Sequence, residues 1–223
     1  MIAVFLQARI DSSRLPGKAL LPIRGKPMVQ VVMERLRMIS ADRYVLVTDG
    51  EGKRQFSPLA TGIGFEVFEG SKEDVLGRFC RAIEAYKPKT VIRATGDNPL
   101  VSWELANRIL ADHLKLRADY SALQGMPLGL GVEVVQASAL LQAEKETLDP
   151  YDHEHVTPYL YRNPHKFYLH RPLVDLEYRS RSRVTVDTEE DYRRVEWIYR
   201  QLGAMEMPGL DDLMPLLRGI EEP

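Results

Sequence analysis

Residues 2–18 have the sequence IAVFLQARIDSSRLPGK, in which a short apolar run passes directly into a polar, basic loop. The apolar part, Ile2–Leu6, predicts a buried strand, because short uninterrupted apolar runs are typical of strands covered on both faces. The loop that follows holds three cationic residues and a single acid. The start of the chain therefore predicts a buried strand that ends in a cationic loop.

The same order of elements recurs over the first 120 residues. Further strands are expected at 43–49, 65–70 and 90–97, and helices from Pro27 onward, at 72–86 and at 103–116. This alternation predicts an α/β fold of three layers, with a mainly parallel twisted sheet and helices on both faces. Ligands of such sheets bind outside the carboxyl ends of the strands. The loops after Leu6, Thr48, Phe68 and Ala94 should therefore share one rim.

The second half of the chain is less regular. Strands are expected at 118–123, 131–136, 167–170 and 183–186, and helices at 138–148, 152–162 and 188–202. We expect one domain over residues 1–203, followed by a C-terminal helical tail over 204–223.

The composition of the chain argues against several classes of function. The chain has 223 residues, 30 basic and 32 acidic, with a net charge of −2, which argues against a general nucleic-acid binder. Its one cysteine, Cys80, excludes an internal disulfide and fits a reducing compartment, so we expect a cytoplasmic protein. No apolar run is long enough to span a bilayer, so no membrane partner is expected. The motifs of P-loop, dinucleotide-binding and serine-hydrolase sites are absent.

Two motifs at the predicted rim can carry phosphate chemistry. Arg9, Arg14 and Lys18 can surround a polyphosphate, with neutral donors from serine side chains and the loop backbone; the alternative is a solvated basic loop. Asp97, in RATGDNPL (93–100), can be a magnesium ligand at a strand end; the alternative is a simple β-turn. Asp187 ends a predicted strand before a helix, where Asp187 or Thr188 can serve as the N-cap.

The pattern A-R-x-x-S-x-R-L-P-G-K at residues 8–18 resembles the nucleotide-binding loop of the cytidylyltransferases that make CMP-activated acidic sugars, such as the CMP-Kdo and CMP-sialic acid synthetases. The form that begins with Gln-Ala-Arg most resembles the SpsF branch, and the resemblance extends over about residues 2–200. It implies a nucleotide-diphospho-sugar transferase fold and transfer of CMP from CTP to a sugar hydroxyl, with magnesium and release of pyrophosphate. It also implies a homodimer, a nucleotide-binding part over about 1–123 and a sugar-binding part over about 124–203.

The resemblance assigns roles to particular residues. Asp97 and Asp187 would hold the metal, and Lys18 and Arg14 would act with them on the phosphates. The nucleotide would be contacted by the following residues: Leu6, Gln7, Ala8, Arg9, Ser13, Arg14, Lys18, Ser71, Arg78, Thr95 and Gly96. For Ser71 the residues alone also allow a helix cap, with Asp74 at the third helical position.

The acceptor sugar would be bound by Glu133, Glu154 and His155, although a buried His155 bonded to Glu133 for structure alone is an alternative. Gly131 and His153 depart from the family pattern, which has Asp and Arg there. Two other functions remain open, a glycosyltransferase of the same fold that uses a nucleotide sugar, and a non-catalytic binding homologue.

Overall fold

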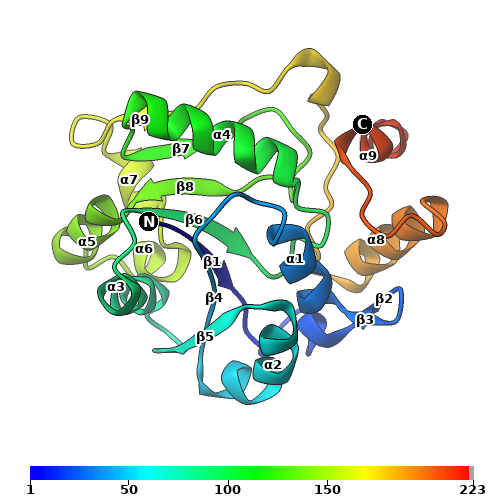
Figure 1. The fold of residues 1–223 in the computed structure, drawn as a ribbon, viewed down its shortest axis with the longest axis horizontal. Coiled ribbons are helices and arrows are strands. Elements are labelled where there is room, and N and C mark those ends of the chain that lie inside the picture. Colours follow the sequence, from blue (N-terminus) through cyan, green and yellow to red (C-terminus); the bar gives the residue numbers. More distant parts are fainter. Residues whose placement is uncertain (221–223) are drawn as a thin grey trace.

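A computed structural model of the chain describes residues 1–220 and consists of one twisted sheet between two layers of helices (Figure 1). The sheet has seven strands in the order β5-β4-β1-β6-β8-β7-β9. These strands are β1 (Ile2–Gln7), β4 (Arg43–Thr48), β5 (Glu66–Glu69), β6 (Thr90–Thr95), β7 (Tyr120–Ala122), β8 (Glu133–Gln136) and β9 (Leu169–His170). A separate hairpin is formed by β2 (Pro22–Ile23) and β3 (Lys26–Pro27). The predicted three-layer α/β fold is confirmed.

The first four strands of the sheet, β5, β4, β1 and β6, are parallel. Strand β8 pairs antiparallel with both β6 and β7, and β7 pairs parallel with β9. Residues 3–6 of β1 are completely buried, because helices cover both faces of the central strands. The carboxyl ends of the four parallel strands consequently lie at one edge, as the sequence predicts.

The helices divide between two apolar cores. One face of the sheet packs against α1 (Met28–Leu36), α2 (Gly50–Ile63), α4 (Trp103–Leu116), α8 (Glu189–Gln201) and α9 (Leu210–Arg218). The other face packs against α3 (Val75–Tyr86), α5 (Ala137–Glu146), α6 (Pro150–His155) and α7 (Pro158–Arg162). Two short 3-10 helices, η1 (Lys18–Leu20) and η2 (Leu176–Tyr178), complete the described elements.

The tail packs into the first of these cores. Helix α9 buries four apolar side chains there, and Arg35 of α1 donates to the carbonyl of Pro208 just before it. Residues 221–223 of the predicted tail lie outside the described residues. Within residues 1–220, no helix has the length and apolar character needed to span a membrane.

Two local predictions need correction, and one helix has no counterpart among the predicted elements. The segment 50–63, which has no element assigned from the sequence, is helix α2, capped by the Asp49 side chain. The predicted helix 152–162 is two helices, because Val156 has a φ of 74° and breaks the run before Pro158. The predicted strand 183–186 is an extended segment that forms only a single-residue bridge, between Arg183 and Leu128, because it runs beside two loops rather than beside a strand.

Candidate active site

A cleft of about 350 Å³ lies at the carboxyl ends of β1 and β6. Its walls come from the basic loop after β1, from the first turn of α3 and from the end of α6. The lining residues are Gln7, Ala8, Arg9, Ser12, Ser13, Arg14, Lys18, Ala19, Val75, Arg93, Thr95, Gly96, Asp97, Glu154, His155 and Asp187. Segments distant in sequence thus meet at the rim that the strand order predicts.

The centre of this cleft is an ammonium group held between two carboxylates. The Lys18 Nζ donates to Asp97 Oδ2 at 3.1 Å and to Asp187 Oδ1 at 3.0 Å. It also donates to the carbonyl of Val186 at 2.7 Å. The two carboxylates converge because the backbone N–H of Val186 donates to the carbonyl of Asp97, which ties the 183–187 segment to the loop after β6.

The basic loop reaches this centre through a left-handed turn. Gly17 has a φ of 69°, a conformation that glycine adopts without strain, and η1 then begins at Lys18. Arg14 forms a salt bridge with Asp187 at 3.1 Å, and Arg183 donates to the other oxygen of the same carboxylate. Burial opposes ionisation of Asp187, but its bonds to Lys18 and the nearby arginines hold its pKa below the usual value.

Thr188, rather than Asp187, is the N-cap of α8, with Asp191 completing a capping box. The Asp187 carboxylate is therefore free of the capping role. In the loop after β6, a Cβ at Gly96 would lie 2.8 Å from the Ala8 Cβ, so the close approach of the two loops requires glycine there. Thr95 donates to Asp97 Oδ1 at 2.6 Å and fixes that carboxylate.

The floor of the cleft contains Arg93, which the sequence analysis does not assign. Its guanidinium donates to Glu133 on β8 and, at 3.1 Å, to the side-chain oxygen of Gln7. Glu133 also accepts from Tyr120 and Thr157. Glu133 itself does not line the cleft, but it is bonded to Arg93, which does. What identifies Arg93 as part of the site is the pairing of β6 with β8, which places Arg93 opposite Glu133.

The far wall is helix α6, which supplies Glu154 and His155. His155 is exposed and its ring lies 4.3 Å from that of Tyr151. The alternative of a buried His155 bonded to Glu133 is therefore wrong, and Glu133 accepts instead from Arg93, Tyr120 and Thr157.

The cleft lining lacks three of the predicted nucleotide contacts: Leu6, Ser71 and Arg78. Arg78 is 2% exposed and donates to the carbonyl of Ser71, while burial lowers its pKa. The N-cap of α3 is Asp74, and Ser71 accepts from the backbone N–H of Asp74, so Ser71 does not cap the helix itself. Leu6 is completely buried in the first core and can contribute only its backbone.

The acidic pair fits a magnesium ion. Asp97 and Asp187 already place one oxygen each within about 3 Å of a single cation, the Lys18 ammonium. Among residues 1–220 no group of three or more acidic, histidine or cysteine side chains could enclose a metal alone. Magnesium commonly takes one or two protein carboxylates and completes its shell with phosphate oxygens and water. The pair and the neighbouring cations suit such a shared site.

A sequence model of the cytidylyltransferase family matches residues 3–206. The chain belongs to that family. It is therefore a nucleotidyltransferase. The family match supports neither the glycosyltransferase nor the non-catalytic alternative.

Curated relatives agree with the family match. The chain is 34% identical to the spore coat polysaccharide biosynthesis protein SpsF of Bacillus subtilis, over 97% of this chain and 93% of that protein. It is also 34% identical to 3-deoxy-manno-octulosonate cytidylyltransferase of Aeromonas hydrophila, over 61% of this chain and 56% of that enzyme.

Solved structures place the fold in the same family. A cytidylyltransferase from Leptospira borgpetersenii superposes with a TM-score of 0.89 at 26% identity, covering 98% of this chain and 94% of that one. The CMP:2-keto-3-deoxy-manno-octonic acid synthetase complexed with CTP has a TM-score of 0.70 at 16% identity, covering 90% and 99%, and shows the shared fold.

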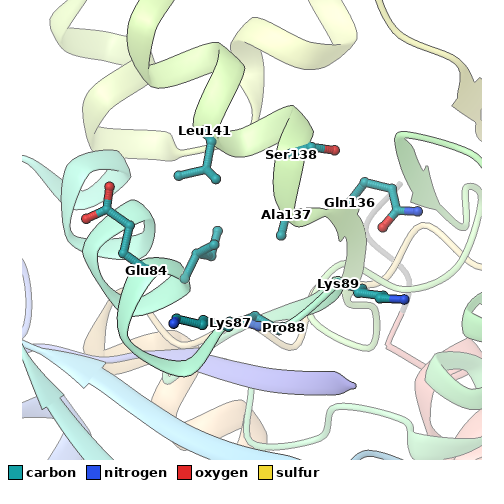
Figure 2. Close-up of a pocket in the computed structure, with 9 residues that line it drawn as sticks. Glu84, Lys87, Pro88, Lys89, Gln136, Ala137, Ser138 and Leu141 are labelled. Carbon is teal, nitrogen blue, oxygen red and sulfur yellow. The ribbon is translucent and has the colours of Figure 1, made fainter.

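A second hollow of the cytidylyltransferase, about 640 Å³, lies between the end of α3 and the start of α5 (Figure 2). It is larger than the rim cleft but lies at the amino end of β6, beside Lys87, Lys89 and Gln136. Glu84 is its one carboxylate, so it offers no acidic pair for a metal. The rim cleft is therefore the candidate active site.

Proposed function

We propose that this nucleotidyltransferase transfers CMP from CTP to a hydroxyl of a sugar and releases pyrophosphate. The observation that carries the proposal is the cluster of Lys18, Asp97 and Asp187 beside the basic loop. It joins a cation-rich phosphate site to a carboxylate pair in one cleft. The resemblance to enzymes of acidic sugars of surface polysaccharides supports a substrate of that kind.

In the proposed reaction the sugar oxygen bonds to the α-phosphorus of CTP. The bond from that phosphorus to the bridging oxygen of the β-phosphate breaks, and pyrophosphate leaves with the electron pair. The hydroxyl proton passes to solvent. Magnesium, when bound by Asp97 and Asp187, would neutralise charge on the phosphate oxygens.

The cations of the loop would hold the leaving group. Arg9, Arg14 and Lys18 line one wall and can donate to the β- and γ-phosphates, where they stabilise developing negative charge. Since Lys18 Nζ occupies the space between the two carboxylates, metal and substrate binding would require this ammonium to turn toward the phosphates.

The division into a nucleotide part, about 1–123, and a sugar part, about 124–203, is also part of the proposal. It places the nucleotide along Gln7, Ala8, Ser13, Thr95 and Gly96. It places the sugar against Glu154 and His155, with Glu133 acting through Arg93. A homodimer rests on the resemblance alone, and light scattering of the purified protein would test it.

Thermal unfolding with CTP, UTP, GTP and ATP, each with and without magnesium, tests the proposal. A ligand at about 100 times its dissociation constant stabilises the native state by about 2.7 kcal/mol. For a chain of this length that is a shift of roughly 5 to 10 °C. A magnesium-dependent shift with CTP alone is expected.

A positive result leads to an assay of pyrophosphate release from CTP, with 3-deoxy-manno-octulosonate as the first sugar because a relative's name includes it. A shift with a different nucleotide would overturn the choice of cytosine. The absence of a shift with all four nucleotides would overturn the nucleotidyl-transfer site.

A further inference from the structure

Helix α6 is a six-residue helix whose place against α3 sets the shape of the cleft. It carries Glu154 and His155 of the lining, and Val75 in the first turn of α3 lines the same cleft. The two helices lie side by side on the same face of the sheet (Figure 1). Whatever fixes α6 to α3 therefore fixes the far wall.

A histidine joins the two helices through both of its ring nitrogens. His153 Nδ1 lies 2.6 Å from Asp74 Oδ1, and Nε2 lies 3.1 Å from the carbonyl oxygen of Thr147. The same Asp74 oxygen accepts from the backbone N–H of Gly77, as the N-cap of α3. Both partners of the ring are acceptors, so both nitrogens must carry a proton for both bonds to form. The observed contacts correspond to an imidazolium.

The other charged groups around this ring have partners of their own. Arg81 of α3 is paired with Glu144 of α5. Asp152 of α6 is paired with Arg162 of α7, which also contacts Asp149. The carboxylate that faces the imidazole is Asp74, whose side chain is 44% exposed, against 23% for His153. Solvent protons can therefore reach the pair.

The backbone at the end of α6 shows why such a contact is needed. Val156 has a φ of 74°, a conformation that β-branched residues rarely adopt. Backbone in such a region persists only where surrounding contacts hold it. The Val156 side chain is completely buried in the second core, which supplies one such contact, and the bonds of His153 within α6 supply another.

We propose that His153, as an imidazolium, is a positioning residue that clamps α6 to the N-cap of α3, and that loss of one ring proton weakens the clamp, because a neutral imidazole can donate only one of the two bonds. The role of the cleft in this inference rests on the proposed function, whereas the clamp itself does not. The hydrogen bond to Asp74 raises the pKa of His153, outweighing the effect of burial. For Asp74, burial acts in the opposite sense, but the bonds from His153 and Gly77 lower its pKa.

The sign of the pH dependence follows from these directions. A group whose pKa rises on folding stabilises the folded state below its ordinary pKa, and this stabilisation is lost as the pH rises through the higher value. The clamp should therefore be complete in mildly acidic solution. It should weaken at the alkaline side of the ordinary histidine pKa of about 6.5, where one of the two bonds is lost.

Nuclear magnetic resonance of the imidazole nitrogens in the full chain tests the protonation state. We expect His153, assigned by the loss of its signals in His153→Arg, to titrate above about 6.5 and to fall toward that value in Asp74→Asn. A His153 that titrates at or below the ordinary value in the wild type would overturn the proposal.

Amide hydrogen exchange over residues 150–157 tests the clamp. After correction for the intrinsic effect of pH, we expect these amides to exchange about tenfold faster once His153 is neutral. His153→Arg, which keeps a charged donor at all pH values, should remove this change. His165→Arg, the same substitution at an exposed histidine, should leave it in place. An unchanged pH dependence in His153→Arg would overturn the clamp.

An acceptor sugar that supports pyrophosphate release from CTP allows a third measurement. Its KM should rise several-fold with pH in the wild type and stay constant in His153→Arg. Failure of the proposed function would appear as no pyrophosphate release in any variant, while the exchange result would still decide the clamp. A KM that rises equally in both proteins would overturn the positioning role.

Discussion

The parallel and the antiparallel parts of the sheet contribute to the cleft in different ways. In the parallel part, the segments that follow β1 and β6 bring Lys18 and Asp97 to the rim. In the antiparallel part, Glu133 lies within β8 and reaches the cleft only through Arg93. Loop side chains beside a rigid sheet are free to act on a ligand, whereas strand side chains support their neighbours. Removing a charge at the rim of the parallel part should therefore mainly lower activity. Removing one in the antiparallel part should mainly lower stability.

The strongest test of this separation is Asp97→Asn in the parallel part. We expect pyrophosphate release to fall by about 10³-fold, because a neutral amide is a poor magnesium ligand. The melting temperature should change by no more than about 2 to 4 °C, since the side chain lies on a rim loop. Enzyme assays and thermal unfolding measure the two effects.

Glu84→Gln, at an exposed carboxylate of α3, is the matched control and should change neither quantity. Wild-type turnover in Asp97→Asn would contradict the metal assignment, and a collapse of stability would contradict the separation.

The antiparallel part is tested by Glu133→Gln. The Arg93 and Glu133 side chains are 13% and 19% exposed, so the loss of the charge leaves a mostly buried guanidinium without its counter-ion. We expect a loss of about 1–3 kcal/mol in the free energy of unfolding, together with lower activity through Arg93 and Gln7. Urea unfolding measures the first effect.

The control is Glu66→Gln, which breaks the cross-strand pair between Arg43 and Glu66 at the exposed edge of the parallel part. Exposed pairs contribute about 0–1 kcal/mol. Equal losses in the two variants would show that burial of the Arg93–Glu133 pair has no energetic consequence.

A pH titration gives a smaller effect. Because the pKa of Asp187 is lowered on folding, its pairs stabilise the protein above the ordinary value of 3.8. That stabilisation is lost as the pH falls through the lower, folded-state pKa. Thermal unfolding of the wild type in acid should show this loss, and Asp187→Asn should reduce it. An identical acid profile in both proteins would mean that the Asp187 pairs are not formed in solution.

The smallest effect is expected in α2, which belongs to the parallel part. Gly62 is an exposed helical glycine with open space around its Cα, so Gly62→Ala should stabilise the protein by about 0.5–1 kcal/mol with unchanged activity. Gly64→Ala should destabilise it, because Gly64 has a φ of 79° at the helix end. Thermal unfolding of both variants makes the comparison, and equal shifts would contradict the backbone argument.

The same contrast decides what the sequence could predict. Apolar runs mark β1, β4 and β6, and the motifs that hold Lys18 and Asp97 follow directly along the chain from β1 and β6. Lys18 and Asp97 could therefore be placed at one rim without a structure. Helix α2 could not be predicted, since it contains Pro58 and three glycines that weaken the helical pattern.

The antiparallel part depends on long-range contacts. The role of Arg93 comes from its register with Glu133, forty residues away, which no local motif records. The break at Val156 could not be predicted either, because valine disfavours the conformation that tertiary packing imposes there.

The two backbone acceptors of Arg35 are made at different times during synthesis of the chain. The buried guanidinium of Arg35, in the first helix, donates to the carbonyls of Val101 and Pro208. Ribosomes add about 5–20 residues each second, so the second acceptor is made roughly 10 to 35 s after the arginine itself. Until then the nascent chain holds a charged group that lacks one of its native acceptors, and the first core stays open to water. The first core, to which α1 contributes, is thus completed only after residues 208–217 have been made.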